Sequence, residues 1–162
     1  MSAELLSRAI KIAAECHAGQ LDKSGDPYIL HPIRVMQRCQ GNFDVMIVAI
    51  LHDTVEDTPL NLEDLRSLGF LDVHIEAIDA MTRRIIIPGG RKELYIGEFI
   101  QRVKKNPIAA YVKYYADIGD NTLPERTSKL APEERKFLAK RYTRAEEELK
   151  EAAEAAKEAL YG

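Results

Sequence analysis

One stretch of the sequence, residues 47–59, constrains the fold and the function of this chain more than any other. Five apolar residues, 47–51, run directly into one imidazole and three carboxylates, which are the side chains of His52, Asp53, Glu56 and Asp57. In a helix, residues four positions apart share a face, so these groups would gather at the C-terminal end of a buried helix. That end of the helix dipole disfavours carboxylates unless a cation lies nearby. The stretch therefore indicates either a divalent metal site or an acidic, solvated turn before Pro59.

In the metal interpretation, His52 and Asp53 are adjacent ligands, and Glu56 and Asp57 stay free of the metal and interact with a water molecule. Two other stretches also place metal-compatible side chains inside apolar helices, and they contain His31 and Asp117. Two imidazoles and two carboxylates without sulfur form a ligand set that suits Mn, Fe, Zn or Mg better than a structural zinc site. A metal ion in such a site would lower the pKa of a bound water and screen the charge of a phosphoryl group.

The rest of the chain predicts an all-α fold. Apolar residues recur at helical spacing in eight segments: residues 3–18, 32–39, 45–57, 61–69, 70–84, 91–105, 107–120 and 132–160. The run Ile85–Gly90 has the composition of a strand, but no other segment resembles a partner for it, and we expect a loop. A length of 162 residues fits one domain. We therefore expect a single helical domain over residues 1–162, with about seven or eight helices and with the C-terminal helix packed on it.

Charge and composition exclude several classes of protein. The chain has 23 Lys and Arg against 26 Asp and Glu, so it lacks the positive excess that nucleic-acid binding requires, and any basic patch must be local. The sequence shows neither a signal segment nor an apolar run of bilayer length. The two cysteines have no metal-finger or disulfide-scaffold spacing. We expect a cytoplasmic protein with no nucleic-acid or membrane partner.

Four motifs, taken together, resemble the HD-domain hydrolases of the RelA/SpoT type, and within them the small stand-alone alarmone hydrolases, including the metazoan type. The motifs cover residues 14–20 (AECHAGQ), 23–32 (KSGDPYILHP), 49–58 (AILHDTVEDT) and the Ala-Asp at 116–117 with Asn121. The resemblance extends over roughly residues 3–145. It implies an all-helical HD-domain bundle, one Mn(II) ion, and hydrolysis of the 3'-pyrophosphate of guanosine tetra- and pentaphosphate (ppGpp and pppGpp), the alarmones of the stringent response.

The resemblance also assigns roles to individual residues. By motif position, the metal ligands are His31, His52, Asp53 and Asp117. Glu56 and Asp57 match the pair that positions and activates the attacking water. Lys23 and Ser24 match a loop beside the nucleotide substrate, where the residues themselves also suggest an anion site, and Asn121 matches a contact to the ribose.

The sequence departs from the family pattern at three places. The family usually has an Arg before Lys23, and this chain has Asp22, which would repel a polyanionic substrate by about 1–4 kcal/mol at a surface-like dielectric. One extra residue precedes Asp117, which in a regular α-helix rotates Lys113 by about 100°. Pro124 replaces a frequent Thr. Two alternatives therefore stay open: a phosphomonoesterase on another nucleotide, such as NADPH, and a nucleotide-sensing module without turnover. The complete set of site residues argues against the module.

Several other residues fit ordinary structural roles. We expect His17 to be a core residue or to support the site from behind, and His74 to be exposed on a helix. The basic residues near 83–84, 91–92, 104–105 and 140–144 are more often solvated charges than a phosphate clamp. An Ala-rich tail at residues 152–159 is compatible with a contact between copies of the chain in a homo-oligomer.

Overall fold

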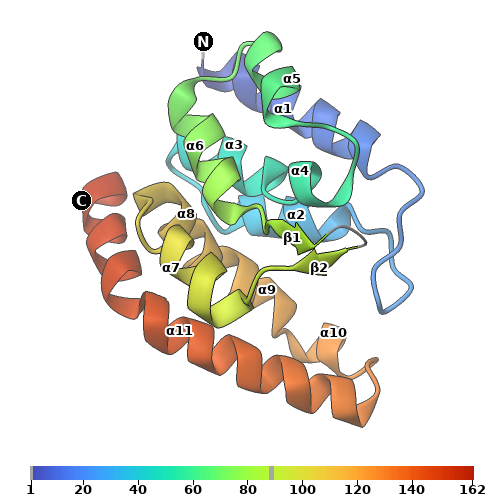
Figure 1. The fold of residues 1–162 in the computed structure, drawn as a ribbon. Helices are drawn as coiled ribbons and strands as arrows, with labels where there is room; N and C mark the ends of the chain where they lie inside the picture. The colour runs from blue at the N-terminus through green and yellow to red at the C-terminus, as the bar shows by residue number, and fades with distance from the viewer. Residues whose placement is uncertain (1, 88–89) are drawn as a thin grey trace.

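The computed structural model describes residues 2–87 and 90–162, and within them the chain is nearly all helical (Figure 1). This confirms the predicted all-α class. The helices of the first half are α1 (Ser2–Cys16), α2 (Leu30–Gln37), α3 (Phe43–Leu51), α4 (Thr54–Asp57), α5 (Leu62–Ser67) and α6 (Asp72–Met81). The second half contains η1 (Tyr95–Phe99), α7 (Ile100–Val103), α8 (Pro107–Tyr111), η2 (Val112–Asp117), α9 (Ile118–Asn121), α10 (Pro124–Thr127) and α11 (Pro132–Tyr161), where η marks a π-helical turn.

Helix α3 forms the centre of the core. Asn42 caps its N-terminus, because its side-chain oxygen accepts the backbone N–H groups of Asp44 and Val45 at 3.1 and 3.3 Å. Val45 and residues 47–51 are all 0% exposed, so the helix is buried on every side, as its uninterrupted apolar run predicts. Helices α1, α2 and α6 pack around it. The core thus fixes the position and direction of the polar residues that follow α3.

Helix α11 lies on the side of the molecule opposite α1 (Figure 1). It is 30 residues long, packs mainly on α8, and buries four side chains spaced along one face, namely Ala145, Leu149, Ala153 and Ala156. Part of the Ala-rich tail therefore contacts this chain's own core, and small residues permit that close approach. The first turns of α11 extend toward α10 and the loop before α2, where they border the pocket described below.

The segment Ile85–Gly90, predicted to be a loop, contains a strand instead. Strand β1 (Ile85–Ile87) pairs antiparallel with β2 (Arg91–Lys92). Next to this pair, Glu93 N donates to the carbonyl of Arg84 at 2.9 Å. The prediction was wrong because a two-residue charged partner has no recognisable strand pattern; Pro88 and Gly89 lie outside the described residues. The helix predicted from residue 91 consequently begins only at Tyr95.

Two further differences concern the helical segments. Several predicted helices are divided, as at His52–Asp53, where the chain turns between α3 and α4. His74, expected to be exposed, is 0% exposed. Its Nδ1 accepts the N–H of Leu71 at 3.2 Å and its Nε2 lies 3.0 Å from Asp44 Oδ1, so it joins the start of α6 to the start of α3.

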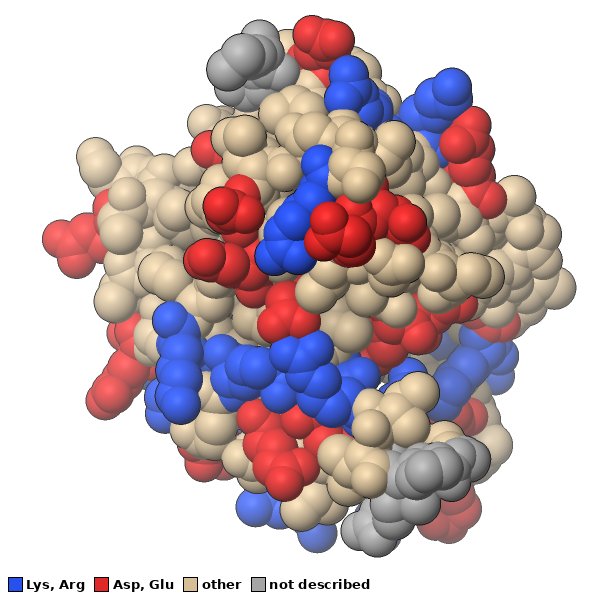
Figure 2. All heavy atoms as spheres, turned by 45° about the horizontal axis from the view of Figure 1, so that its top comes forward, with Lys and Arg blue, Asp and Glu red and all other residues tan. Residues whose placement is uncertain are grey.

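Charge is distributed unevenly over the surface. Figure 2 shows Lys and Arg side chains gathered in a band across one face, with acidic groups on both sides of the band. Positive charge is therefore local, as the composition requires. None of the helices in the described part of the chain has the length and apolar character needed to cross a bilayer.

Candidate metal centre and substrate pocket

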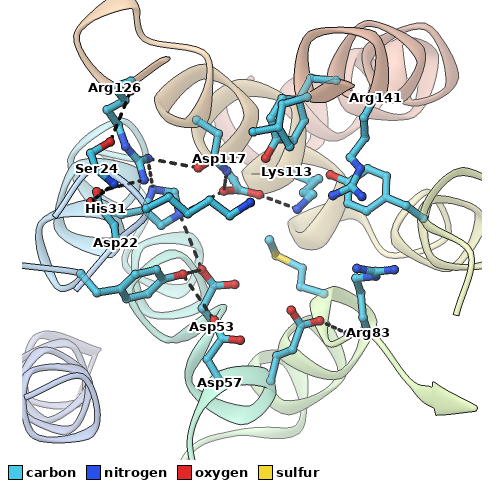
Figure 3. A pocket seen from close by; sticks show the side chains of 18 of the residues that line it. Asp22, Ser24, His31, Asp53, Asp57, Arg83, Lys113, Asp117, Arg126 and Arg141 are labelled. Carbon is cyan, nitrogen blue, oxygen red and sulfur yellow. Dashed lines mark hydrogen bonds and ion pairs between the residues drawn. The ribbon is translucent and has the colours of Figure 1, made fainter. Parts of the chain in front are cut away.

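Four polar side chains from three separate parts of the chain meet at one point, and Figure 3 shows three of them, His31, Asp53 and Asp117. His31 comes from the first turn of α2, His52 and Asp53 from the turn after α3, and Asp117 from the end of η2. His31 Nε2 lies 3.2 Å from Asp117 Oδ1 and 3.6 Å from Asp53 Oδ2. His52 Nε2 lies 2.8 Å from Asp53 Oδ2 and 3.6 Å from Asp117 Oδ1. Atoms that bind one ion at about 2.1 Å are roughly 3–3.5 Å apart, so these separations suit a shared cation.

In each imidazole, a hydrogen bond of Nδ1 to a group outside the cluster leaves Nε2 facing the cluster. His52 Nδ1 lies 2.7 Å from the carbonyl of Ala49, so it must carry the proton. In neutral His52, Nε2 then has only a lone pair to offer, and it faces two carboxylates. Among the described residues this buried nitrogen has no hydrogen-bond partner. His31 is held in the same way, with Nδ1 2.7 Å from Asp120 Oδ2. Two imidazole nitrogens and two carboxylates that converge on one point are the donor set that a divalent cation requires, so the residues present fit a metal ion.

Without a cation, protons partly satisfy the cluster. Burial by itself lowers the pKa of His31, but hydrogen bonds to Asp117, Asp120 and Asp53 outweigh burial and raise it to about 9. The pKa of His52 is also raised well above its ordinary value, because Asp53 and Asp117 overcome the effect of burial. Protons and a metal ion would therefore compete for the same imidazole nitrogens.

The carboxylates of Glu56 and Asp57 lie beside Asp53, yet they differ in environment. Glu56 Oε1 accepts the backbone N–H of Arg83 at 2.8 Å, and its Oε2 lies 3.3 Å from Lys92 Nζ, so the β1–β2 region holds it. Asp57 Oδ2 has a long contact of 3.4 Å to the hydroxyl of Tyr28. Burial raises the pKa of Asp57 to about 6, and the charges of Asp53 and Glu56 add to this shift. Asp57 is therefore the carboxylate better prepared to take a proton near neutral pH.

A pocket of about 350 Å³ opens in front of the cluster. It brings together nearly all the residues that the sequence singled out, and the candidate residues that line it are Lys23, Ser24, His31, Asp53, Glu56, Asp57, Asp117 and Asn121. The exception is His52, which is buried and 1% exposed. Asn121 Nδ2 donates to Asp117 Oδ1 at 2.7 Å, so in this structure it holds a side chain of the cluster.

The loop of residues 22–24 forms one wall of the pocket, and its charges are already paired. Asp22 Oδ1 accepts the backbone N–H groups of Ser24 and Asp26 at 2.8 and 3.0 Å, and its Oδ2 lies 3.5 Å from Arg126 Nη2. Lys23 forms an ion pair with Glu134 of α11. Asp22 thus turns into its own loop, and Arg126 compensates its charge.

The extra residue before Asp117 is taken up by a π-helical turn. The segment η2 (Val112–Asp117) has i→i+5 hydrogen bonding, which accommodates one more residue in a turn than an α-helix does. The rotation expected for a regular α-helix therefore does not apply. Lys113 lines the pocket, and its Nζ lies 2.5 Å from Asp117 Oδ2. This contact neutralises the oxygen of Asp117 that does not face the imidazoles.

Sequence reasoning missed three residues that organise the site. Asp120 is 0% exposed and holds His31, Arg34 and Arg126. Tyr28 donates its hydroxyl to Asp53 at 2.5 Å. Tyr28 and Asp120 lie inside the recognised motifs, so their positions were a usable signal, whereas Arg126 belongs to α10, a short helix that periodicity did not predict.

Comparisons with known proteins relate this chain to one family model and to several named relatives. Residues 9–72 match the family described as HD domain. A probable GTP pyrophosphokinase of Mycobacterium leprae is 31% identical over 144 residues, which are 86% of this chain and 18% of that protein. The bifunctional (p)ppGpp synthase/hydrolase SpoT of Escherichia coli is 36% identical over 66 residues, 39% of this chain and 9% of its own length. The chain thus spans less than a fifth of either relative.

A solved structure of a metazoan ortholog of SpoT, described as hydrolysing ppGpp, superposes with a TM-score of 0.73 at 20% identity and covers 96% of this chain and 94% of the other. The HD-domain match thus covers residues 9–72, and the chain shares the fold of the metazoan ortholog of SpoT.

Proposed function

We propose that this protein is a metal-dependent phosphohydrolase that releases the 3'-pyrophosphate from guanosine tetra- or pentaphosphate. The observation that carries the proposal is the convergence of His31, His52, Asp53 and Asp117 on one point, with the lone pair of His52 Nε2 directed at carboxylates. The activities that the relatives and the metazoan ortholog are named for, (p)ppGpp synthesis or hydrolysis, support the choice of substrate.

The four side chains would hold a divalent ion, which we propose to be Mn(II). Nitrogen and oxygen donors without sulfur suit Mn(II), and the ion would supply a bound water of lowered pKa and screen the phosphoryl charge. Asp120 holds the ring of His31 through Nδ1, and Ala49 holds the ring of His52 in the same way. These contacts leave both Nε2 atoms directed at the same point.

Asp57 would accept the proton of the attacking water, and Glu56 would hold that water in place. The pKa of Asp57, raised to about 6, places this group close to the pH at which a general base is most effective. Because Glu56 Oε1 accepts the N–H of Arg83, the oxygen that would contact water is Oε2, which lies 3.3 Å from Lys92 Nζ. Asn121 and Ser24 would contact the nucleotide at the mouth of the pocket, with Lys23 available if it leaves Glu134.

One observation favours a second candidate, phosphate release from another nucleotide such as NADPH. The wall formed by residues 22–24 carries Asp22, and its neighbouring cations are paired with Asp22 and Glu134. A purine base therefore finds no unpaired cation on this wall. The candidate function differs from the first in the leaving group, which is phosphate instead of pyrophosphate.

The test is incubation of the purified protein with Mn(II) and a panel of ppGpp, its adenosine analogue and NADPH, with identification of the leaving group. We expect pyrophosphate from ppGpp, loss of activity with EDTA, and recovery on adding Mn(II). Asp53→Ala should abolish both metal binding and turnover. A protein that binds no metal and loses nothing in Asp53→Ala would instead be a nucleotide-sensing module, and the proposal would be wrong.

A further inference from the structure

The cations on the side of the pocket nearest α2 are all committed to carboxylates. Arg126 contacts Asp120 and Asp22, and Lys23 pairs with Glu134. At the back of the pocket, Lys113 pairs with Asp117. These cations are already neutralised, so a second anionic group of a substrate would gain little by approaching them.

The opposite side of the pocket is different (Figure 3). There Arg83 and Arg141 point toward the cavity, and among the described residues neither guanidinium group has a carboxylate oxygen within 4.0 Å. Both lie against one ring: the guanidinium carbon of Arg141 is 4.8 Å, and that of Arg83 is 5.6 Å, from the ring centroid of Tyr95. Stacking on the ring holds the two guanidinium groups without neutralising their charge.

In the part of the chain that the structure describes, two buried polar atoms at the same place have no hydrogen-bond partner. They are the hydroxyl of Tyr95 and Nε of Arg83. Arg83 is otherwise held, because its Nη2 donates to the carbonyl of Glu93 at 2.6 Å. Buried donors without partners are rare in folded proteins. Since both atoms belong to residues that line the pocket, an acceptor bound there would satisfy them.

Further cationic side chains lie next to Tyr95 and Arg141, outside the pocket. Tyr95 and Arg141 also line an adjoining groove between η1 and α11, which contains Lys140, Arg144 and the exposed ring of Phe137. Arg141 lies 4.7 Å from the Phe137 ring centroid, so its guanidinium is stacked between two aromatic side chains. Lys140 and Arg144 also lack a carboxylate within 4.0 Å in the described part of the chain.

We propose that Arg83, Arg141 and the Tyr95 hydroxyl form a second anion subsite, which binds a phosphate group of the substrate other than the one that is hydrolysed. This inference rests on the proposed function and adds the residues that would select a nucleotide with a second, separate phosphate group. One phosphate group would lie at the cluster of His31, His52, Asp53 and Asp117. The other would lie against Arg83, Arg141 and the Tyr95 hydroxyl. In ppGpp, the second group is the 5'-diphosphate.

Steady-state kinetics with two substrates test the subsite. Arg141→Ala should raise KM for ppGpp about tenfold or more while kcat changes little, because the lost contact forms in the ground state and the transition state alike. KM for guanosine 3'-diphosphate, which lacks 5'-phosphates, should be the same for wild type and variant. Lys150→Ala removes an exposed cation from the same helix outside the pocket and is the matched control. An equal effect on both substrates, or none, would overturn the subsite.

Calorimetric titration with guanosine 5'-diphosphate separates this inference from the hydrolase proposal, because it needs no turnover. Tyr95→Phe removes only a hydroxyl that has no hydrogen-bond partner among the described residues, so a merely structural role would leave affinity unchanged. Weaker binding by Tyr95→Phe and Arg141→Ala, with Lys150→Ala like wild type, supports the subsite even where no nucleotide is hydrolysed, in which case the hydrolase proposal alone is wrong. Equal affinity in all four proteins overturns the subsite and leaves hydrolysis of ppGpp to stand on its own assay.

Discussion

Replacing Asp120 by Asn should weaken both the fold and the binding of a metal ion. The Asp120 carboxylate is 0% exposed and receives three partners: His31 Nδ1 at 2.7 Å, Arg34 Nε at 2.6 Å and Arg126 Nη1 at 2.5 Å. Asparagine keeps the shape and one acceptor oxygen, so His31 can still donate to it. The two guanidinium groups, however, lose the negative charge that both of them contact.

The expected loss of stability follows from the burial of these partners. Removing one member of a buried ion pair costs about 3–5 kcal/mol. The side chain of Arg34 is 35% exposed and that of Arg126 is 17% exposed, so solvent recovers part of this cost. We therefore expect a decrease of about 3 kcal/mol in the free energy of unfolding. Because an uncharged partner holds the His31 ring less firmly, Mn(II) affinity should fall about 10- to 100-fold.

Urea denaturation in EDTA measures the first effect, and competition with a chelating indicator dye measures the second. Asp79→Asn is the matched control, since Asp79 also binds a guanidinium through both oxygens, each 2.7 Å from Arg84, but at the surface. It should cost less than about 1 kcal/mol and leave metal affinity unchanged. If Asp120→Asn costs no more than Asp79→Asn, or if it binds Mn(II) as wild type does, the positioning argument for Asp120 is refuted.

Three further predictions concern the site. Asp57→Asn should lower kcat about 10²- to 10⁴-fold, and Glu56→Gln less, since Glu56 Oε1 is tied to Arg83; steady-state assays that show equal losses would contradict this assignment. The metal-free protein should lose stability as pH rises from about 6.5 to about 9. The pKa of His31 is about 9 in the folded state and about 6.5 in the unfolded state, so protonated His31 stabilises the fold fully below about pH 6.5, and this stabilisation is lost as pH rises through about 9. A free energy of unfolding that does not change over this pH range, measured by urea titration in EDTA, would contradict the prediction. Asp22→Asn retains an acceptor for the N–H groups of Ser24 and Asp26 but removes the charge, so KM for ppGpp should fall about fivefold, equivalent to about 1 kcal/mol; a higher KM would show that Asp22 supports substrate binding.

The parts of the fold that sequence predicted are those determined by local periodicity. The apolar run before His52 forms the buried α3, and the long segments at 3–18 and 132–160 correspond to α1 and α11. The strand pair was not predictable in this way, because Arg91 and Lys92, which pair with β1, are two charged residues with no strand pattern. His74 was misjudged for a similar reason, since its partner Asp44 belongs to another helix.

In the candidate site, too, some residues were predictable from the sequence, whereas their contacts with residues from other segments were not. Motif order and spacing selected the residues that the structure brings to one pocket, because these residues occupy matching positions in the motifs that the chain shares with the family it resembles. Spacing could not select Arg126, which comes from a separate short helix, or the pairing of Asp22 with it. Nor could it show that Arg83 and Arg141 share the ring of Tyr95, since these residues lie on three different segments. Contacts of this kind depend on the packed chain.

The π-helical turn at Val112–Asp117 has a consequence for how related sequences are aligned. It stores one additional residue within a single turn, while Asp117 still reaches the imidazoles. A one-residue difference in length at this motif is therefore no sign that the aspartate has been lost. An alignment of RelA/SpoT-type chains should place its gap inside this turn before any member is judged inactive.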